Sequence, residues 1–115
     1  MLTDKQLEDR KKYIGGGDCA AVLGLSRYAT PLSVWCDKLD KLPKEDVSKK
    51  LHIKMGNRLE EVVAELFTEE TGKAVRRVNE TFYHPKYPFL AANIDRRVVG
   101  EDAILECKTA SGWLA

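Results

Sequence analysis

The feature that most constrains the fold is one long helical pattern followed by three strand-like segments. Between His52 and Thr71, apolar residues recur at the spacing of a helix, and Gly72 follows as a residue suited to end it. The expected core face of this helix consists of Leu59, Val62, Val63, Leu66 and Phe67. The segments AVRRVNETFYH, FLAANIDRRVVG and AILECKTA then read as strands, with a hairpin turn at Gly100 to Ala103. Helices followed by an antiparallel meander predict an α+β protein.

The N-terminal half carries helix signals of its own. The first dozen residues predict a charged helix, and IGGGDCAAVLGLS predicts a glycine-rich turn leading into a short helix that Gly24 ends. In TPLSVWCDKLDKLP, Thr30 is suited to cap a helix and Pro31 to occupy its first position. The helical spacing predicts one buried stripe, made of Leu32, Trp35, Cys36 and Leu39.

Length and composition narrow the class of protein. The 115 residues suit a single domain spanning the whole chain, and 43% hydrophobic residues indicate a folded rather than a disordered protein. The net charge of +1 gives no overall attraction to nucleic acid, so such binding would depend on local patches. No apolar run matches a membrane span or a signal peptide. Three widely spaced cysteines argue against a disulfide framework and favour a reducing cytoplasm.

The segment ILECKTA begins like a buried strand and then places an acid and a lysine on one face. If Val99 pairs with Ile104 across the hairpin, Asp95 lies opposite Lys108, and Glu106 lies diagonally from Asp95. Diagonal neighbours on one face are within about 7–8 Å, so the two carboxylates and the lysine would converge. In the same register, Arg97 lies opposite Glu106. A slip of one residue would scatter this group over both faces.

Two neighbouring carboxylates and a lysine suit phosphate chemistry. The carboxylates repel each other and recruit a cation, and Mg²⁺ binds well to one or two carboxylates with several waters. Lys108 would then hold a water or stabilise developing negative charge. An ordinary surface hairpin with a cross-strand Asp–Lys pair explains the same spacing equally well.

Glu60 is a further candidate because it lies one residue from the apolar stripe of the long helix. If that helix packs on the sheet, Glu60 points along the sheet toward the carboxylates. The alternative is a solvated helix face, which Glu60 would share with Glu61, Glu65 and Glu69.

The motifs together resemble the YqaJ-like viral recombinase domain, a relative of lambda exonuclease in the PD-(D/E)xK nuclease superfamily. The resemblance rests on RKKYIGGGDCAAVLGLSRYATPLSVWCDKLDKLP, MGNRLEEVVAELFTEETG and YHPKYPFLAANIDRRVVGEDAILECKTA, and it runs from about Arg10 to the end of the chain. The D…ExK pattern alone is weakly specific, whereas this ordered set is highly specific. The resemblance implies a restriction-endonuclease-like core and a deoxyribonuclease that depends on Mg²⁺ or Mn²⁺. It also implies a phage or prophage origin and a place in the bacterial cytoplasm.

The resemblance also implies roles for individual residues. Glu60, Asp95 and Glu106 correspond to acidic residues of the metal site, with the main-chain carbonyl of Cys107 as a further ligand. Lys108 corresponds to the residue that positions or activates the water.

The glycine turn matches the part of the family that holds phosphates at DNA ends. The residues concerned are Arg10, Gly15, Gly16 and Gly17. A turn that enters a helix exposes N–H groups that bind anions, although glycines also simply permit chain reversal. Relatives usually carry Ser where this chain has Gly17, so one hydroxyl hydrogen bond to phosphate is missing.

Basic residues in the strands form another candidate surface for DNA. The cluster consists of Arg76, Arg77, Arg96 and Arg97, with Lys86 nearby. These side chains would follow a phosphate backbone electrostatically, or they are ordinary exposed charges on strands without a binding role.

The expected function is an exonuclease that resects linear double-stranded DNA, with a single-strand annealing protein as partner. The family domain continues beyond LECK, so residues 1–115 are expected to be the N-terminal portion of a nuclease domain. Trp113 and Leu114 would begin the next helix, and the full protein is expected to be a homo-oligomer. Two alternatives are a non-catalytic module that binds DNA ends or a partner with the same fold, and an assembly protein with incidental carboxylates.

Overall fold

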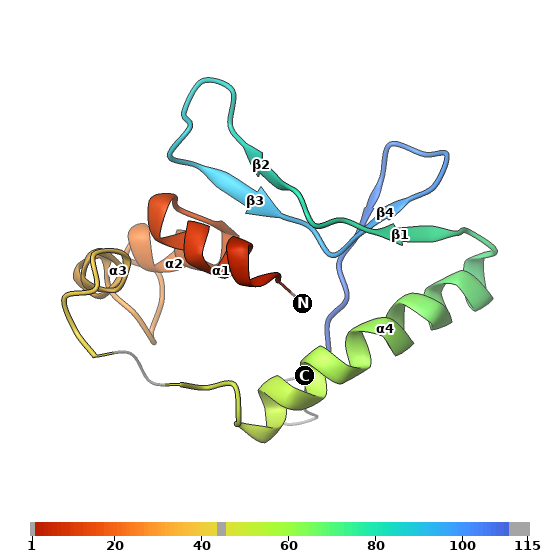
Figure 1. The fold of residues 1–115 in the computed structure, drawn as a ribbon, viewed down its shortest axis with the longest axis horizontal. Coiled ribbons are helices and arrows are strands. Elements are labelled where there is room, and N and C mark those ends of the chain that lie inside the picture. The colour runs from red at the N-terminus through yellow and green to blue at the C-terminus, as the bar shows by residue number, and fades with distance from the viewer. Residues whose placement is uncertain (1, 44–45, 111–115) are drawn as a thin grey trace. The chain divides into compact units, whose positions relative to one another are not determined.

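The computed structural model describes residues 2–43 and 46–110, which fold into helices and two antiparallel sheets (Figure 1). The α+β class predicted from the sequence is therefore confirmed. The described residues divide into two compact units. Residues 46–78 and 94–110 form the first, which we call the α4 unit. Residues 2–43 and 79–93 form the second, the glycine-turn unit. The helix expected at Trp113 lies outside the described residues.

The α4 unit consists of one long helix and a three-stranded sheet. Helix α4 spans Leu51–Thr71, and Gly72 ends it with φ +71°, a left-handed conformation that glycine adopts without strain. The sheet contains β1 (Val75–Arg77), β4 (Arg96–Val98) and β5 (Ile104–Leu105) in the order β1-β4-β5. The described helices include none long and apolar enough to cross a membrane.

The three predicted segments pair in the predicted antiparallel order, but the meander is interrupted because each of the first two predicted strands is split. Strands β2 (Thr81–Tyr83) and β3 (Ala91–Asn93) pair with each other as a separate sheet in the glycine-turn unit. Three residues separate β1 from β2, but only two separate β3 from β4. The register therefore changes by one residue between the two pairings, and one regular ladder cannot run through both.

Helix α4 buries a narrower stripe than its sequence predicts. Ala64 is the one residue of α4 in the buried class, at 3% exposure, whereas Leu59, Val63 and Phe67 are half-buried. Val62 and Leu66 were expected in the core but are 44% and 50% exposed. The three strands have two or three residues each, so they cover only the stripe centred on Ala64.

The glycine-turn unit gathers three helices and the β2–β3 hairpin. Its helices are α1 (Asp4–Asp9), α2 (Cys19–Val22) and α3 (Pro31–Lys38), with short 3-10 helices at Arg10–Lys12 and Gly16–Asp18. Asn93 is the polar centre of this unit. Its amide donates to the Tyr13 hydroxyl at 2.7 Å, and its side-chain oxygen accepts from Gln6 and Thr81. These bonds satisfy side chains that would be costly to bury unpaired.

The predicted helix start at Thr30 and helix end at Gly24 are confirmed in this unit, but the predicted buried face of α3 is wrong. Thr30 caps α3 by accepting from the Ser33 N–H, and Gly24 takes φ +73° after α2. The expected stripe is largely exposed, with Leu32 at 67%, Trp35 at 53% and Leu39 at 51%. The half-buried residues of α3 include Lys38, because its ammonium reaches back to the Arg10 carbonyl at 2.7 Å.

Candidate active site

The hairpin that joins β4 to β5 sets the positions of Asp95, Glu106 and Lys108. Arg96 faces Leu105, and Arg97 faces Ile104, so the register is shifted by two residues from the predicted one. Gly100 takes φ +81° inside a four-residue loop that the Val98 N–H closes by donating to the Ala103 carbonyl. The predicted positions of Asp95 opposite Lys108 and of Arg97 opposite Glu106 are therefore wrong.

A shift of two residues moves the partners without changing the face on which they lie, because side chains alternate with a period of two. Asp95 and Glu106 are the next residues beyond the Arg96–Leu105 pair, so they follow as neighbours across the hairpin. The carboxylate of Asp95 is fixed there, since its Oδ2 accepts from the Cys107 N–H at 2.8 Å. Asp95 is half-buried at the break between β3 and β4.

Glu106 and Lys108 lie just after β5, where the chain is no longer a regular strand. The Lys108 ammonium is 3.1 Å from Glu106 Oε1, and the two side chains are 80% and 51% exposed. An exposed ion pair of this kind contributes little to stability. Both side chains are therefore available to solvent and to a ligand.

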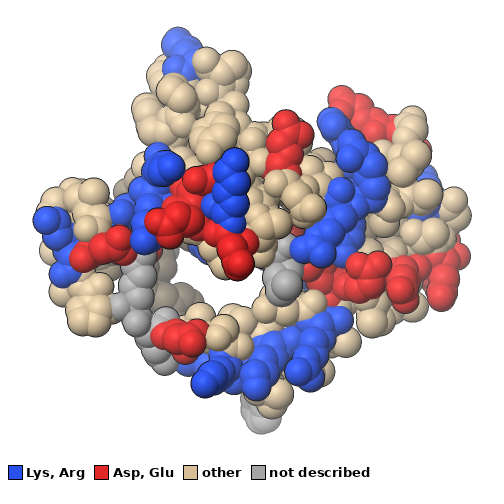
Figure 2. All heavy atoms as spheres, in the orientation of Figure 1, with Lys and Arg blue, Asp and Glu red and all other residues tan. Residues whose placement is uncertain are grey.

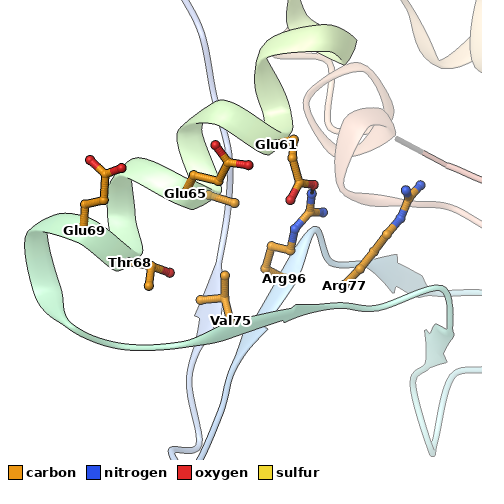
Figure 3. Close-up of a pocket in the computed structure, with 8 residues that line it drawn as sticks. Glu61, Glu65, Thr68, Glu69, Val75, Arg77 and Arg96 are labelled. Carbon is orange, nitrogen blue, oxygen red and sulfur yellow. Dashed lines mark hydrogen bonds and ion pairs between the residues drawn. The ribbon is translucent and has the colours of Figure 1, made fainter.

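Glu60 reaches the sheet through an arginine that the sequence did not single out for this role. The side chain of Glu60 is 11% exposed, and its Oε1 lies 3.4 Å from Arg96 Nη1. Arg96 is 4% exposed and also donates to Glu61 Oε2 at 2.9 Å and to the Asp95 carbonyl at 3.0 Å. Figure 3 shows the Arg96 side chain extending from the sheet to Glu61 on α4.

The predicted strand cluster of basic residues is thus only partly available to DNA. Arg96 is enclosed in ion pairs, so it cannot track a phosphate backbone as proposed from the sequence. Arg97 is 41% exposed, with Asp102 at 4.0 Å, and Arg76 and Arg77 are exposed. The sequence did contain a sign that Arg96 is buried. Side chains alternate along β4, so Arg96 shares the buried face of Val98.

The three carboxylates act together on one group, the thiol of Cys107. Burial raises the pKa of this thiol, and the negative charges of Asp95, Glu60 and Glu106 raise it further, while Arg96 opposes them. All three carboxylates therefore lie within electrostatic range of the same atom. Thr109 Oγ1 would lie 3.8 Å from a Cβ on Gly56, so the segment after β5 reaches α4 one turn before Glu60.

The donors fit a hard divalent cation in type, because carboxylate and carbonyl oxygens are what Mg²⁺ and Mn²⁺ prefer. Glu60, Asp95 and Glu106 each have a partner of their own in Arg96, the Cys107 N–H and Lys108. Within residues 2–43 and 46–110, no three His, Cys, Asp or Glu side chains are grouped closely enough to hold a metal ion. A cation would be bound through the second oxygen of each carboxylate, because these partners contact Glu60 Oε1, Asp95 Oδ2 and Glu106 Oε1.

One N–H group of the glycine turn is already hydrogen-bonded to a nearby side chain. Gly15 donates to Asp18 Oδ2 at 3.0 Å, and the Lys38 ammonium lies 2.9 Å from the same oxygen. Burial alone would raise the pKa of Asp18, but the Gly15 N–H, Lys38 and Arg10 together hold it below its ordinary value. Gly16 and Gly17 are exposed, and a Cβ on either would meet open space. Arg10 is exposed as well.

Helix α4 carries a charge pattern that sequence reasoning missed. Figure 2 shows Lys and Arg gathered over its N-terminal half and Asp and Glu over its C-terminal half. The basic residues Lys50, Lys54 and Arg58 recur every four residues, and Lys54 and Arg58 are exposed. Lys54 in the first turn and Glu69 in the last turn oppose the helix dipole, at a cost of about 0.3–1 kcal/mol each, so this order does not stabilise the helix.

The acidic half of α4 borders a groove of about 430 Å³. Glu61, Glu65 and Glu69 form one wall of this groove, and Val75, Arg77 and Arg96 lie across from them (Figure 3). The spacing of four residues in both halves was readable from the sequence. A phosphate backbone would be attracted by the first half of the helix and repelled by the second.

Comparison with known proteins agrees with the motifs. The family model of the YqaJ-like viral recombinase domain matches residues 5–114. The uncharacterized protein YqaJ of Bacillus subtilis (strain 168) is 43% identical to this chain over 113 residues. That match covers 98% of this chain and 35% of the relative, so the chain spans about a third of the relative's length. No solved structure matches.

The chain therefore belongs to the YqaJ-like viral recombinase domain family. That family is described as one of viral recombinase domains.

Proposed function

We propose that the chain is the catalytic part of a metal-dependent deoxyribonuclease with a PD-(D/E)xK core. Its substrate is linear double-stranded DNA, which it resects from the ends during phage-type recombination. The observation that carries the proposal is that Arg96 bonds both Glu60 and the Asp95 carbonyl, while the Cys107 N–H holds the Asp95 carboxylate and Lys108 pairs with Glu106, in a member of this family.

In this proposal the carboxylates of Glu60, Asp95 and Glu106, with the Cys107 carbonyl, hold Mg²⁺ or Mn²⁺. A bound divalent ion supplies an activated water and neutralises charge that builds on the phosphate. Lys108 is 80% exposed on its side chain, so it can leave Glu106 and hold the attacking water by hydrogen bonding. Asp95 is kept in place throughout by the Cys107 N–H.

Contacts to DNA are assigned by charge. The exposed Lys54 and Arg58 of α4 offer phosphate contacts, and they precede Glu60 on the same helix. Arg10, Gly16 and Gly17 are exposed and are assigned to the phosphate at the DNA end, and Gly15 would join them only by exchanging its bond to Asp18. The expected partner is a single-strand annealing protein, the full protein is expected to be a homo-oligomer, and the place of action is the bacterial cytoplasm.

Degradation of linear duplex DNA with 5′ phosphates tests this function. The chain is incubated with Mg²⁺ or Mn²⁺ and, in parallel, with a chelator, and closed circular DNA serves as the control for end dependence. Loss of the linear DNA alone, only with metal and not in Glu106→Gln, is the expected result. Equal loss of circular DNA would replace the exonuclease with an endonuclease, and cleavage that survives Glu106→Gln would remove Glu106 from the site.

A DNA-end binding module without turnover is the second candidate. It is favoured by the ion pairs and hydrogen bond that occupy the three carboxylates. Tight binding of duplex ends in chelator with no cleavage in either metal would support this candidate over the nuclease.

A further inference from the structure

Among the described residues, Arg96 is the most deeply buried charged residue that the proposed chemistry leaves without a role. It is 4% exposed, and it bonds two carboxylates of α4 and the carbonyl of the residue just before β4. Its Nη1 lies 3.4 Å from Glu60 Oε1 and 3.0 Å from the Asp95 carbonyl oxygen. Its Nη2 donates to Glu61 at 2.9 Å. One guanidinium thus joins α4 to the residue that precedes β4.

We infer that Arg96 is a positioning residue for Glu60, an inference that rests on the proposed metal site. Because one nitrogen touches both groups, Glu60 Oε1 and the Asp95 carbonyl can be no farther apart than the two distances combined. A guanidinium presents its donors in a rigid fork, so it fixes direction as well as charge. Partners that orient metal-binding carboxylates in this way commonly change metal affinity about 10–100-fold when removed.

Simple electrostatics makes the opposite prediction, which allows a sharp test. A positive charge beside a cation site repels the cation, so removing Arg96 would tighten metal binding if charge were its only contribution. If Arg96 positions Glu60, removing it weakens metal binding although a repulsive charge is lost. A lysine at this position keeps the charge but loses the fork, so it separates the two effects.

The test is titration calorimetry of the whole chain with Mn²⁺. The variants are Arg96→Met, Arg96→Lys and Glu61→Gln. Thermal unfolding in chelator reports separately on folding. The expected result is an Mn²⁺ affinity at least about tenfold weaker in both Arg96 variants. Glu61→Gln is the matched control, because it removes only the partner that is 68% exposed, and it should change affinity less than about twofold.

Three results would overturn the inference. Tighter binding in Arg96→Met with no change in Arg96→Lys would make Arg96 a plain charge. Unchanged affinity with a lower unfolding temperature would make it a purely structural residue. Absence of Mn²⁺ binding in the wild-type chain would refute the proposed metal site itself, and the inference would fall with it. Should Arg96→Met fail to fold, the affinity of Arg96→Lys decides.

Discussion

Each of the two units contains one carboxylate–cation pair that is largely shielded from solvent. In the α4 unit, Arg96 and Glu60 have side chains that are 5% and 11% exposed. In the glycine-turn unit, Lys38 and Asp18 are 13% and 17% exposed. The chemistry of the two pairs is similar, yet their surroundings differ. Arg96 brings Glu60 toward Asp95, whereas Asp18 and Lys38 complete the bonding of a turn.

The two pairs therefore have different roles. The Arg96–Glu60 pair orients groups of the candidate site, whereas the Lys38–Asp18 pair stabilises a turn. Arg96 also bonds the Asp95 carbonyl, and Glu106 pairs with the exposed Lys108, so in the proposed function this pair lies beside acidic groups that would hold a cation. Around Asp18, the Gly15 N–H that would suit a phosphate is already bonded to the carboxylate. We therefore expect the α4 unit to contribute mainly to chemistry and the pair in the glycine-turn unit to contribute mainly to stability.

The largest predicted effects, one on cleavage rate and one on stability, come from replacing one lysine in each unit by alanine. Lys108→Ala should lower the rate of duplex degradation by about 100-fold or more, because a donor aimed at developing charge is lost. Its side chain is 80% exposed, so the free energy of unfolding should hardly change. Lys38→Ala is the matched variant. It should lower the free energy of unfolding by about 1–2 kcal/mol through loss of the Asp18 pair and the Arg10 hydrogen bond.

Cleavage rates and urea unfolding, measured on both lysine variants, would test whether Lys108 serves catalysis and Lys38 serves stability. If Lys108→Ala destabilised the chain and Lys38→Ala abolished cleavage, the comparison between the units would be reversed.

A smaller effect is expected from the two halves of α4. Lys54→Ala and Arg58→Ala should each weaken duplex binding in chelator and reduce the slope of log affinity against log salt by about one. Glu65→Gln is the control on the acidic half, and it should leave that slope unchanged. Fluorescence anisotropy at several salt concentrations measures both quantities. Equal slopes in all variants would remove α4 from the DNA surface.

Much of the local structure could be predicted, because its signals are read within a few residues. Thr30 and Pro31 begin α3, and Gly72 ends α4, because capping and backbone preferences act at the position itself. The buried side of a helix depends on what packs against it. Leu32 and Leu66 therefore read as core residues but are largely exposed.

The candidate site was predictable in its residue types but not in its contacts. The same-face placement of Asp95 and Glu106 survives a register shift of two, because that shift preserves the alternation. Arg96 was read as a surface charge, since its partner Glu60 lies 36 residues earlier and on another element. The alternation of β4 puts Arg96 on the buried face of Val98, but only the packing of α4 on the sheet could show which partners it meets there.

The pH dependence of stability should show whether Asp18 stabilises the folded chain, as its contrast with the Arg96 pair requires. Its pKa in the folded chain is below the ordinary value of 3.8, so the folded state binds fewer protons than the unfolded state in that range. The stabilisation is therefore fully present above this value and is lost as pH falls through the lower, folded pKa. Asp18→Asn should be less stable at neutral pH by about 1 kcal/mol and should lose less stability on acidification. Urea unfolding from neutral to acidic pH measures this, and parallel curves for the two proteins would contradict it.

The smallest predicted effect concerns Cys107, and it tests directly whether the carboxylates gather in the α4 unit. Burial and the negative charges of Asp95, Glu60 and Glu106 raise the pKa of its thiol above the ordinary value of 9.0. In a chain with Cys19→Ser and Cys36→Ser, Cys107 should therefore be alkylated slowly at mildly alkaline pH, because little thiolate is present. Glu60→Gln and Glu106→Gln should each lower the thiol pKa and speed alkylation by a few-fold, since each removes one negative charge. Glu8→Gln, in the glycine-turn unit, is the control that should leave the rate unchanged. The pH profile of the rate distinguishes a change in pKa from a change in access. An unchanged midpoint in Glu106→Gln would mean that Glu106 lies outside the group of carboxylates, and the proposed metal site would then lose one of its ligands.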